Sequence, residues 1–424
     1  MITKKEIAPG VTLRCCRDSR FKQGCLSFQL VRPMKKEEAA KNALLSSVLL
    51  RGTKYHPDLR SVTAKLDTLY GASVSPLVRR IGDYQTVGFY CGFMDDRFAL
   101  PGDKVLEPML RFLEEILLDC PVENGGLRRD FVESEKRNLA ATIDAELNDK
   151  RAYANNQLLR TMCRNDSFGI PRLGEKEAVL SIDAVDLYDH YQTILRESPI
   201  QVFYVGSAQP EQVEALLAPI WQRLERDPFV LLPQTGFHSC PGEDVEEILE
   251  VSQGKLCLGY TTPITNRDDN FPAMQVMNTI FGAGMTSKLF MNVRERLSLC
   301  YSVGSSYFGT KGIVIVSAGI DFDKEAMTRA EVHAQLEACR RGEISDAELL
   351  SAKEALLSSL RATHDSPAAI EGYYATAALS GMPLSPEAYM AAVEAVTKEQ
   401  AAAAARLITP HSSYFLKGAA NEAN

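Results

Sequence analysis

Histidine is scarce in this chain, and the histidines that occur are poorly spaced for binding a metal ion. The chain has six, and no two of them lie three or four residues apart: His56, His190, His238, His333, His364 and His411. A hydrolytic metal site needs about three ligands, usually with two of them one helical turn apart. Only His333 has a glutamate at helical spacing, Glu337, and its stretch "EVHAQLEACRR" is typical of an exposed helix face. The sequence therefore predicts no metal site and no cofactor.

Several other catalytic signatures are also missing. The ten cysteines include no C-x-x-C pair, and the chain has no G-x-S-x-G and no G-x-x-x-x-G-K-[ST]. These absences argue against a zinc knuckle, a serine-hydrolase nucleophile turn and a phosphate-binding loop. The stretch "FGAGMTS" has two close glycines, but no Lys-Ser or Lys-Thr follows them. We therefore do not interpret it as a phosphate site.

The sequence also lacks an excess of positive charge and any long apolar run. It has 47 Lys and Arg against 55 Asp and Glu, a net charge of -8, which disfavours nucleic acid as a partner. No run approaches the roughly 18 apolar residues of a membrane span, and the start, "MITKKEIAPG", has no apolar signal region. Cysteines without a pairing pattern fit reduced thiols. We expect a cytoplasmic protein with no membrane span.

The pattern of elements along the chain is that of a soluble α+β protein of two or three domains. The first half shows two strand-like runs, two helices, a hairpin with Gly-Asp at its turn, further helices and a closing strand, "IQVFYVG". The second half repeats this order from "EEILEVSQGKLCLGYTTP" to "SSYFLKG". The sequence therefore predicts a duplicated unit of about 200 residues, although two unrelated α+β domains would also fit.

The predicted boundaries follow from this repeat. We expect one domain over residues 1–225, a Pro- and Gly-rich linker over 226–245 and a second domain over 246–424. Strands grouped in hairpins, with helices in runs between them, predict an antiparallel sheet in each domain, covered on one face by helices.

Two stretches and the internal duplication together resemble a known family. The first helix ends in "NALLSSVLLRGT" at residues 42–53, the second half carries "VRERLSLCYSV", and the halves are duplicated. Nearly the whole chain resembles the pitrilysin/insulinase-type zinc peptidases, the inverzincins. The resemblance implies two homologous domains arranged as a clam-like pair. In active members the first helix carries H-x-x-E-H before Gly-Thr, with two histidines on zinc and the glutamate as general base.

The zinc-binding residues of that pattern are absent here. Counting back from Gly52-Thr53 places the two histidines at Ala43 and Ser47 and the glutamate at Ser46. Alanine has no donor atom, and a serine hydroxyl is a poor zinc ligand and too weak a base. The third ligand of the family falls on Ile143, or on Asp144 if the alignment slips by one residue. The resemblance thus implies a peptidase fold without the zinc chemistry.

The second-half motif is better retained. Active members of the family carry an Arg and a Tyr seven residues apart that hold the substrate peptide, and Arg294 and Tyr301 have that spacing here. A plainer interpretation is a surface charge and a strand residue packed on the sheet. The stretch "GAGMTSKLF" resembles the glycine-rich segment before that motif, with Gly282 and Gly284 expected to allow a bend.

These features favour a catalytically inactive, peptidase-like subunit that pairs with an active zinc-binding homologue, or with itself, to hold and process peptides. Two alternatives remain: a stand-alone peptide-binding or scaffolding protein, and an active metallopeptidase with an atypical site. They differ in whether a partner chain is needed and in whether zinc copurifies with the chain.

Overall fold

The computed structural model describes residues 2–383 and 385–418 and has an α+β fold, as the sequence predicts. The chain divides into two compact units that do not follow the two halves of the sequence throughout. Unit 1 comprises residues 1–144, 170–233 and 364–379, and unit 2 comprises residues 145–169, 234–363 and 380–424. Residues 225–243, within and beside the predicted linker, have no regular secondary structure.

Unit 1 is built on a six-stranded sheet in the order β1-β2-β8-β3-β5-β4. All neighbouring strands are antiparallel except β2 and β8, which are parallel. The strands are β1 (Ile2–Ala8), β2 (Val11–Arg17), β3 (Gln23–Pro33), β4 (Ser73–Ile81), β5 (Tyr84–Met94) and β8 (Ile200–Gly206). The central strands β3 and β8 are buried along almost their whole length, so they place the core of the unit at the middle of the sheet.

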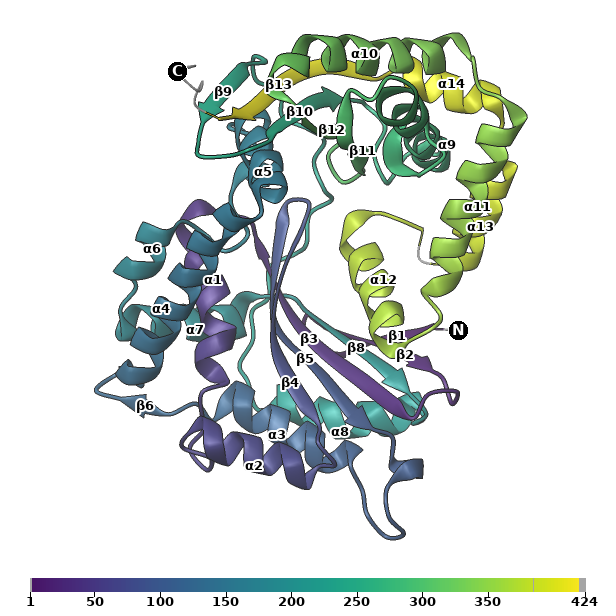
Figure 1. Ribbon diagram of the computed structural model, residues 1–424. Helices are drawn as coiled ribbons and strands as arrows, with labels where there is room; N and C mark the ends of the chain where they lie inside the picture. Colours follow the sequence, from purple (N-terminus) through teal and green to yellow (C-terminus); the bar gives the residue numbers. More distant parts are fainter. Residues whose placement is uncertain (1, 384, 419–424) are drawn as a thin grey trace. The chain divides into compact units, whose positions relative to one another are not determined.

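The helices of unit 1 gather mainly on one face of this sheet, below and to the left of the strands in Figure 1. They are α1 (Lys36–Leu49), α2 (Leu59–Thr68), α3 (Leu106–Leu118), α4 (Arg129–Ala145), α6 (Lys176–Ser181), α7 (Ala184–Glu197) and α8 (Pro210–Gln222). The short strands β6 (Val122–Glu123) and β7 (Gly126–Leu127) form a separate hairpin. One apolar core runs through the sheet and these helices and includes the fully buried Phe28, Phe112 and Trp221.

Unit 2 repeats the sheet with five strands in the order β11-β12-β10-β13-β9. Here β13 and β9 are the parallel pair, and the other pairs are antiparallel. The strands are β9 (Asp244–Ile248), β10 (Gly254–Thr261), β11 (Cys300–Phe308), β12 (Ile313–Ile320) and β13 (Thr409–Lys417). Apart from β1, both sheets have the same sequence of strand directions, and each hairpin occupies the same edge. This agreement supports the duplication predicted from the sequence.

The helices of unit 2 include two segments with π-helical geometry. The regular helices are α9 (Phe271–Asn278), α10 (Glu325–Arg341), α11 (Asp346–Ala362), α13 (Pro386–Ala395) and α14 (Lys398–Arg406). Between α9 and β11 lie two π-helical segments, η4 (Thr279–Ala283) and η5 (Leu289–Arg296). The sequence predicts helices here but not their wider π geometry, which is rare and often occurs at functional sites.

The two repeats exchange one helix each. Helix α5 (Lys150–Met162), from the first half of the chain, packs its Leu158, Leu159 and Met162 with the apolar residues of β10, β12 and β13 in unit 2. Helix α12 (Pro367–Ser380), from the second half, lies on the sheet of unit 1 (Figure 1). Each sheet therefore carries most of its helices on one face and a single helix from the other repeat on the opposite face.

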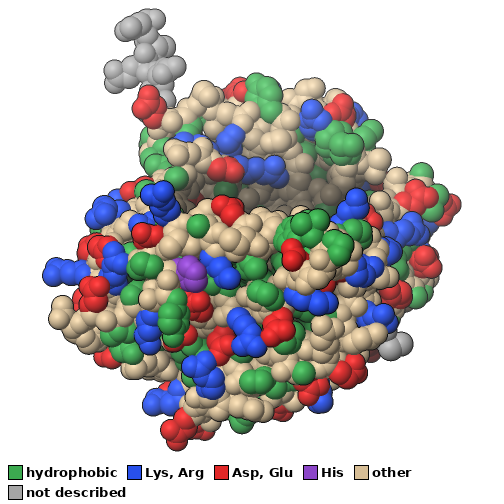
Figure 2. Space-filling view, turned by 90° about the horizontal axis from the view of Figure 1, so that it is seen from below, with side chains coloured by type: hydrophobic (Ala, Val, Ile, Leu, Met, Phe, Trp, Pro, Cys, Tyr) green, Lys and Arg blue, Asp and Glu red, His purple; other side chains and the backbone are tan. Residues whose placement is uncertain are grey.

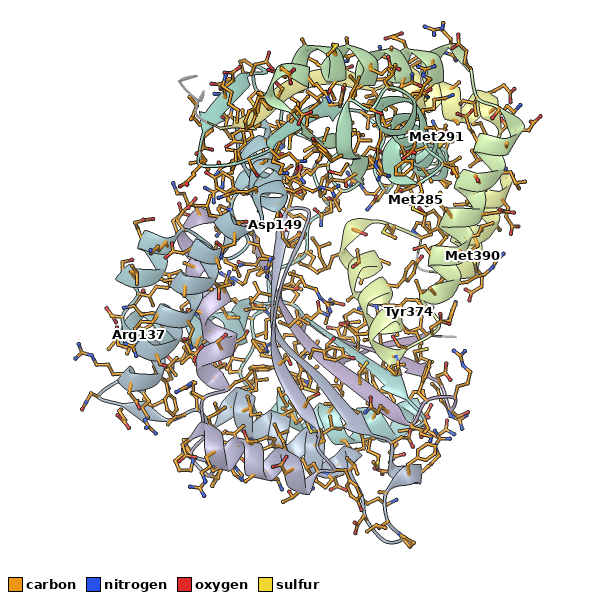
Figure 3. The ribbon with its side chains drawn as sticks, in the orientation of Figure 1. Arg137, Asp149, Met285, Met291, Tyr374 and Met390 are labelled. Carbon is orange, nitrogen blue, oxygen red and sulfur yellow. The ribbon has the colours of Figure 1, made fainter. Side chains whose placement is uncertain are left out.

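The sequence of residues 128–160 predicts one continuous helix, but in the structure it is broken before α5, and this break permits the exchange. After α4, residues 146–148 form one 3₁₀ turn, and Asp149 then caps α5 by accepting hydrogen bonds from the backbone N–H groups of Arg151 and Ala152 (Figure 3). Aspartate at a helix N-cap satisfies donors that have no partner within the helix, so it favours a new start over continuation. Among the described residues no helix is both long and apolar enough to span a membrane.

Candidate peptidase-like site

Helix α1 carries Ala43, Ser46 and Ser47, where the active family members have His, Glu and His, and places them in the interior of unit 1. Ala43 and Ser46 are only 4% and 2% exposed, and Ser47 is half-buried. The helix contacts β4 and β5 on one side and α6 and α7 on the other, so most of its surface is covered. Small side chains suit this position, because a helix enclosed on two sides has little volume to spare.

The side chain of α1 that joins a buried hydrogen-bond network is that of Asn42, and not those of Ala43, Ser46 or Ser47. Its amide donates to the side-chain oxygen of Gln85 at 2.8 Å, and its own oxygen lies 2.8 Å from Nε2 of His190. Burial lowers the pKa of His190 to about 4, so the ring is neutral at pH 7 and donates through Nε2 to Asn42. This chain of neutral groups links α1 to β5 and α7, and it has no counterpart in the predictions from sequence.

The Gly52-Thr53 landmark has a structural function of its own. A Cβ at Gly52 would lie 2.9 Å from the backbone carbon of Pro57, so only glycine fits this close approach. The hydroxyl of Thr53 accepts from the backbone N–H groups of Tyr55 and His56 and donates to the carboxylate of Glu115. Nδ1 of His56 lies 2.6 Å from the same carboxylate. The landmark therefore closes the turn after α1 and joins it to α3.

One carboxylate near the end of α1 is that of Glu135 in α4, whereas Ile143 and Asp144 lie further along that helix. Glu135 lies 3.4 Å from Nη1 of Arg51, which directly follows α1. Ile143 packs against the apolar core, and Asp144 pairs with Lys176 at 2.5 Å. The nearby acidic side chain is thus already neutralised by a guanidinium, which is a fixed positive charge.

The residues present do not fit the zinc ion that the family resemblance implies. Ala43 offers no donor, Ser46 is buried with a neutral hydroxyl, and Glu135 is engaged by Arg51. Within the described residues no group of three or more His, Cys, Asp or Glu side chains is arranged to hold a metal. The His333 and Glu337 pair does not form one, because His333 packs edge-on against Tyr260 while Glu337 pairs with Arg340.

Arg294 and Tyr301 lie side by side in unit 2, but they meet through the backbone. Nε of Arg294 donates to the main-chain carbonyl of Tyr301 at 3.1 Å, and its guanidinium carbon lies 4.7 Å from the centre of the Phe290 ring. The phenol of Tyr301 donates to Asp321 at 3.0 Å, and this hydrogen bond raises the pKa of Tyr301. Tyr301 is 61% exposed, so it does not pack on the sheet as the plainer interpretation required.

The two glycines before this pair differ in their surroundings. A Cβ at Gly282 would lie 2.7 Å from Leu289 and from the hydroxyl of Ser305, so glycine is needed for η4 to approach β11. At Gly284 a Cβ would meet nothing closer than 3.8 Å, and the backbone there is extended. The expected bend at these two positions stays a prediction, and the structure gives a packing reason for Gly282 only.

Two exposed methionines lie in the segment between Gly284 and Arg294, and the predictions from sequence assign them no function. Met285 lies on the loop between η4 and η5, and Met291 lies within η5 (Figure 3). They are 78% and 49% exposed. Methionine is flexible and polarisable, and it occurs often on surfaces that bind varied partners. The signal was present in "GMTSKLFMN", where two methionines flank the polar loop.

Fold and site together define a class: a two-unit α+β protein with a peptidase-like arrangement of elements and no residues able to hold a catalytic metal. Residues 181–356 match the family model described as the peptidase M16 inactive domain. The "Probable inactive metalloprotease YmfF" of Bacillus subtilis (strain 168) is 31% identical over 409 residues, which covers 96% of each chain. The chain belongs to the M16 peptidase family and is a pseudo-peptidase, which confirms the resemblance drawn from the sequence.

Solved structures share this fold over the whole chain. A conserved protein from Enterococcus faecalis V583 superimposes with a TM-score of 0.90 at 26% identity, over 100% of both chains. A structure described as the peptidase M16 inactive domain from Pseudomonas fluorescens gives a TM-score of 0.81 at 17% identity, also over 100% of both chains. The second likeness concerns the fold alone.

Proposed function

We propose that this chain is a non-catalytic subunit that pairs with an active zinc-binding homologue, or with a second copy of itself, to hold and process peptides. The observation that carries the proposal is the contrast between two sites. Helix α1 has Ala43 and buried Ser46 where a metal site needs donors. Arg294 and Tyr301, in contrast, are kept and adjacent, with Tyr301 exposed and Arg294 half-buried.

The geometry around Arg294 supports a peptide-holding function. Its Nε is engaged by the Tyr301 carbonyl, Phe290 lies beneath its guanidinium, and Nη1 pairs with Glu295 at 3.1 Å. The side chain is therefore held in one orientation, while 40% of it remains exposed to solvent. A peptide carbonyl or carboxylate could replace the Glu295 contact, because an exposed ion pair contributes little stability. The exposed Met285 and Met291 add apolar surface in the segment that leads to Arg294.

Co-expression tests the partnership. The full chain would be produced with a homologue from the same genome that carries H-x-x-E-H, and the mixture analysed by size-exclusion chromatography with light scattering. We expect a complex that contains both chains and that cleaves an unfolded peptide in a chelator-sensitive way. The chain alone should show no cleavage. A chain that remains monomeric, with no binding to the homologue and no dimer of its own, would contradict the proposal.

The second candidate is a stand-alone peptide-binding protein, favoured by the exposed Met285 and Met291 in the segment that precedes Arg294. It predicts that the monomer binds an unfolded peptide without a partner chain. Fluorescence anisotropy with a labelled peptide separates the two functions, because only the first requires a partner chain, either the homologue or a second copy, for tight binding.

The proposed location is the cytoplasm. This proposal rests on the ten cysteines, which form no disulfide among the described residues and include nine buried thiols. Burial raises the pKa of several of these thiols, and it raises those of Cys15 and Cys257 to about 12. These thiols are therefore inert rather than reactive.

The surface charge does not favour nucleic acid as a partner. On the face shown in Figure 2, basic and acidic side chains are interspersed, without a continuous basic stripe of the kind that nucleic acid requires.

A further inference from the structure

Unit 1 contains a pocket whose wall includes no residue of α1 and neither Arg294 nor Tyr301. The pocket has a volume of about 350 Å³ and is formed where α7 meets the C-terminal ends of α3 and α8. Small-molecule sites in proteins usually measure about 300 to 1,000 Å³. The cavity is therefore large enough for a ligand of modest size, and its wall consists only of residues from unit 1.

One wall of the pocket is apolar and aromatic. Tyr188, Tyr191 and Leu195 follow one another at helical spacing on α7, so they share one face, and Leu224 follows the end of α8. The rings of Tyr188 and Tyr191 lie 5.9 Å apart with an angle of 32° between them. Tyr191 is fixed in place, because its hydroxyl donates to the carbonyl of Leu117 at 2.6 Å.

The charged part of the wall is predominantly basic. Three cations line the pocket, Lys54, Arg196 and Arg223, against one acid, Glu225. The acidic partners of these cations are not part of the wall: Asp119, Glu197 and Glu114. Each of the three cations has more than half of its side chain exposed. Such pairs are weak and readily exchange one anion for another.

The C-terminal ends of α3 and α7 lie at this pocket, but their carbonyls do not offset the excess of positive side chains in its wall. The C-terminal end of a helix carries partial negative charge on its free carbonyls. Here the Leu117 carbonyl of α3 accepts from Tyr191, and the Leu195 carbonyl of α7 accepts from Arg226. Arg226 also donates to the carbonyl of Ser198 at 2.5 Å. Because these carbonyls are engaged, the exposed side chains decide which charge the pocket attracts.

We propose that this pocket binds a small amphipathic carboxylate, with its apolar body against Tyr188, Tyr191 and Leu224 and its carboxylate at Arg196 and Arg223. The site is independent of the proposed peptide-holding function, because it shares no residue with α1 or with the Arg294 and Tyr301 pair. Lys54 adds a third cation to the wall.

Octanoate is a suitable probe, since it combines a short acyl chain with one carboxylate, and octylammonium is its match with the opposite charge. Binding of each to the full chain would be measured by isothermal titration calorimetry. The single tryptophan, Trp221, provides a second readout, because it lies in α8 two residues before Arg223. We expect octanoate to bind at least tenfold more tightly than octylammonium. Equal binding of the two, or no octanoate binding below its micelle concentration, would overturn the proposal.

Three variants locate the binding. The double variant Arg196→Ala, Arg223→Ala removes two cations from the wall, and Gln192→Phe fills the mouth from an exposed position. Each should weaken octanoate binding at least tenfold. The control is Arg111→Ala, which removes an exposed cation of α3 that pairs with Glu107 and does not line the pocket. Octanoate binding that survives both pocket variants, or that falls equally in the control, would contradict the assignment. Circular dichroism verifies that all variants fold.

Discussion

The guanidinium of Arg294 donates to the backbone carbonyl of Tyr301, and the phenol of Tyr301 turns away to Asp321. The two residues are thus coupled through the main chain at the start of β11, and each keeps a free face. Arg294 presents charge, and Tyr301 presents an exposed ring. This arrangement makes separate predictions for the two side chains and for the helix that has lost its metal ligands.

Replacement of Arg294 should weaken peptide binding without unfolding the chain. Arg294→Ala removes the positive charge that we propose holds a peptide carbonyl or carboxylate. We expect about a tenfold rise in Kd, which corresponds to roughly 1.4 kcal/mol. Anisotropy with a labelled unfolded peptide measures the change. Arg296→Ala is the matched control, because Arg296 is an exposed cation two residues away that pairs with Glu331. An equal loss in both variants would point to general electrostatics instead.

Glutamate should be tolerated at Ser47 but not at Ser46. Ser46→Glu places a carboxylate where the native residue is 2% exposed, beside Leu45 and Leu49. Burying an unpaired charge and extra volume is expected to lower the free energy of unfolding by about 3 kcal/mol or more. Ser47→Glu, at a half-buried position, should cost about 1 kcal/mol or less. Urea denaturation compares the two. A loss for Ser46→Glu as small as about 1 kcal/mol would show that α1 has room for the family's general base.

The buried carboxylate of Glu371 should be essential for holding α12 on the sheet of unit 1. Arg79 donates to it twice, at 3.0 and 2.8 Å, and Ser27 and Gln29 donate at 2.7 and 2.8 Å. Breaking a buried pair by removing one partner costs about 3–5 kcal/mol. We expect Glu371→Gln to destabilise unit 1 within this range and to speed amide exchange in α12. Glu107→Gln, in an exposed pair with Arg111, should change stability by less than about 0.5 kcal/mol.

Stability should fall with acid through His190. The folded pKa is lowered to about 4 from an ordinary value of 6.5, so the unfolded chain binds this proton first. The contribution is therefore fully present above pH 6.5 and is lost as the pH falls toward 4, by roughly 3 kcal/mol. Urea denaturation at pH 7.5 and pH 5 should show a smaller difference for His190→Gln, which can still donate to Asn42. An unchanged pH dependence would exclude His190 as its source.

Much of the fold could be predicted from local pattern. The helix expected over residues 37–50 is observed at Lys36–Leu49, and the hairpin with Gly82-Asp83 at its turn joins β4 and β5. Helix α8 was not predicted, although Pro210 at its start and apolar residues at helical spacing were visible in the sequence. The exchange of α5 and α12 could not be predicted, because periodicity shows that a helix has an apolar face but not which sheet covers it.

The candidate site also has a part that the sequence could predict and a part that it could not. Gly52-Thr53 is a fixed landmark with a steric reason, so counting back from it located Ala43, Ser46 and Ser47 on one helix. Helix α4 offers no such landmark, and the count that led to Ile143 passed over Glu135, the carboxylate that meets Arg51. The hydrogen bonds of Asn42 with Gln85 and His190 join residues up to 148 positions apart, and no local pattern indicates them.

The exchange of α5 and α12 between the two repeats also bears on how such a chain could arise. A single repeat, made alone, would present one sheet with an uncovered face and one helix with nothing to pack against. Two copies could satisfy each other only by swapping that helix, as an intertwined dimer whose assembly depends on concentration. Joining the copies through an irregular segment makes the swap intramolecular, so its effective concentration is set by the length of the connection. Cleavage within residues 225–243 should therefore leave two fragments that remain associated, and neither should fold fully when made by itself.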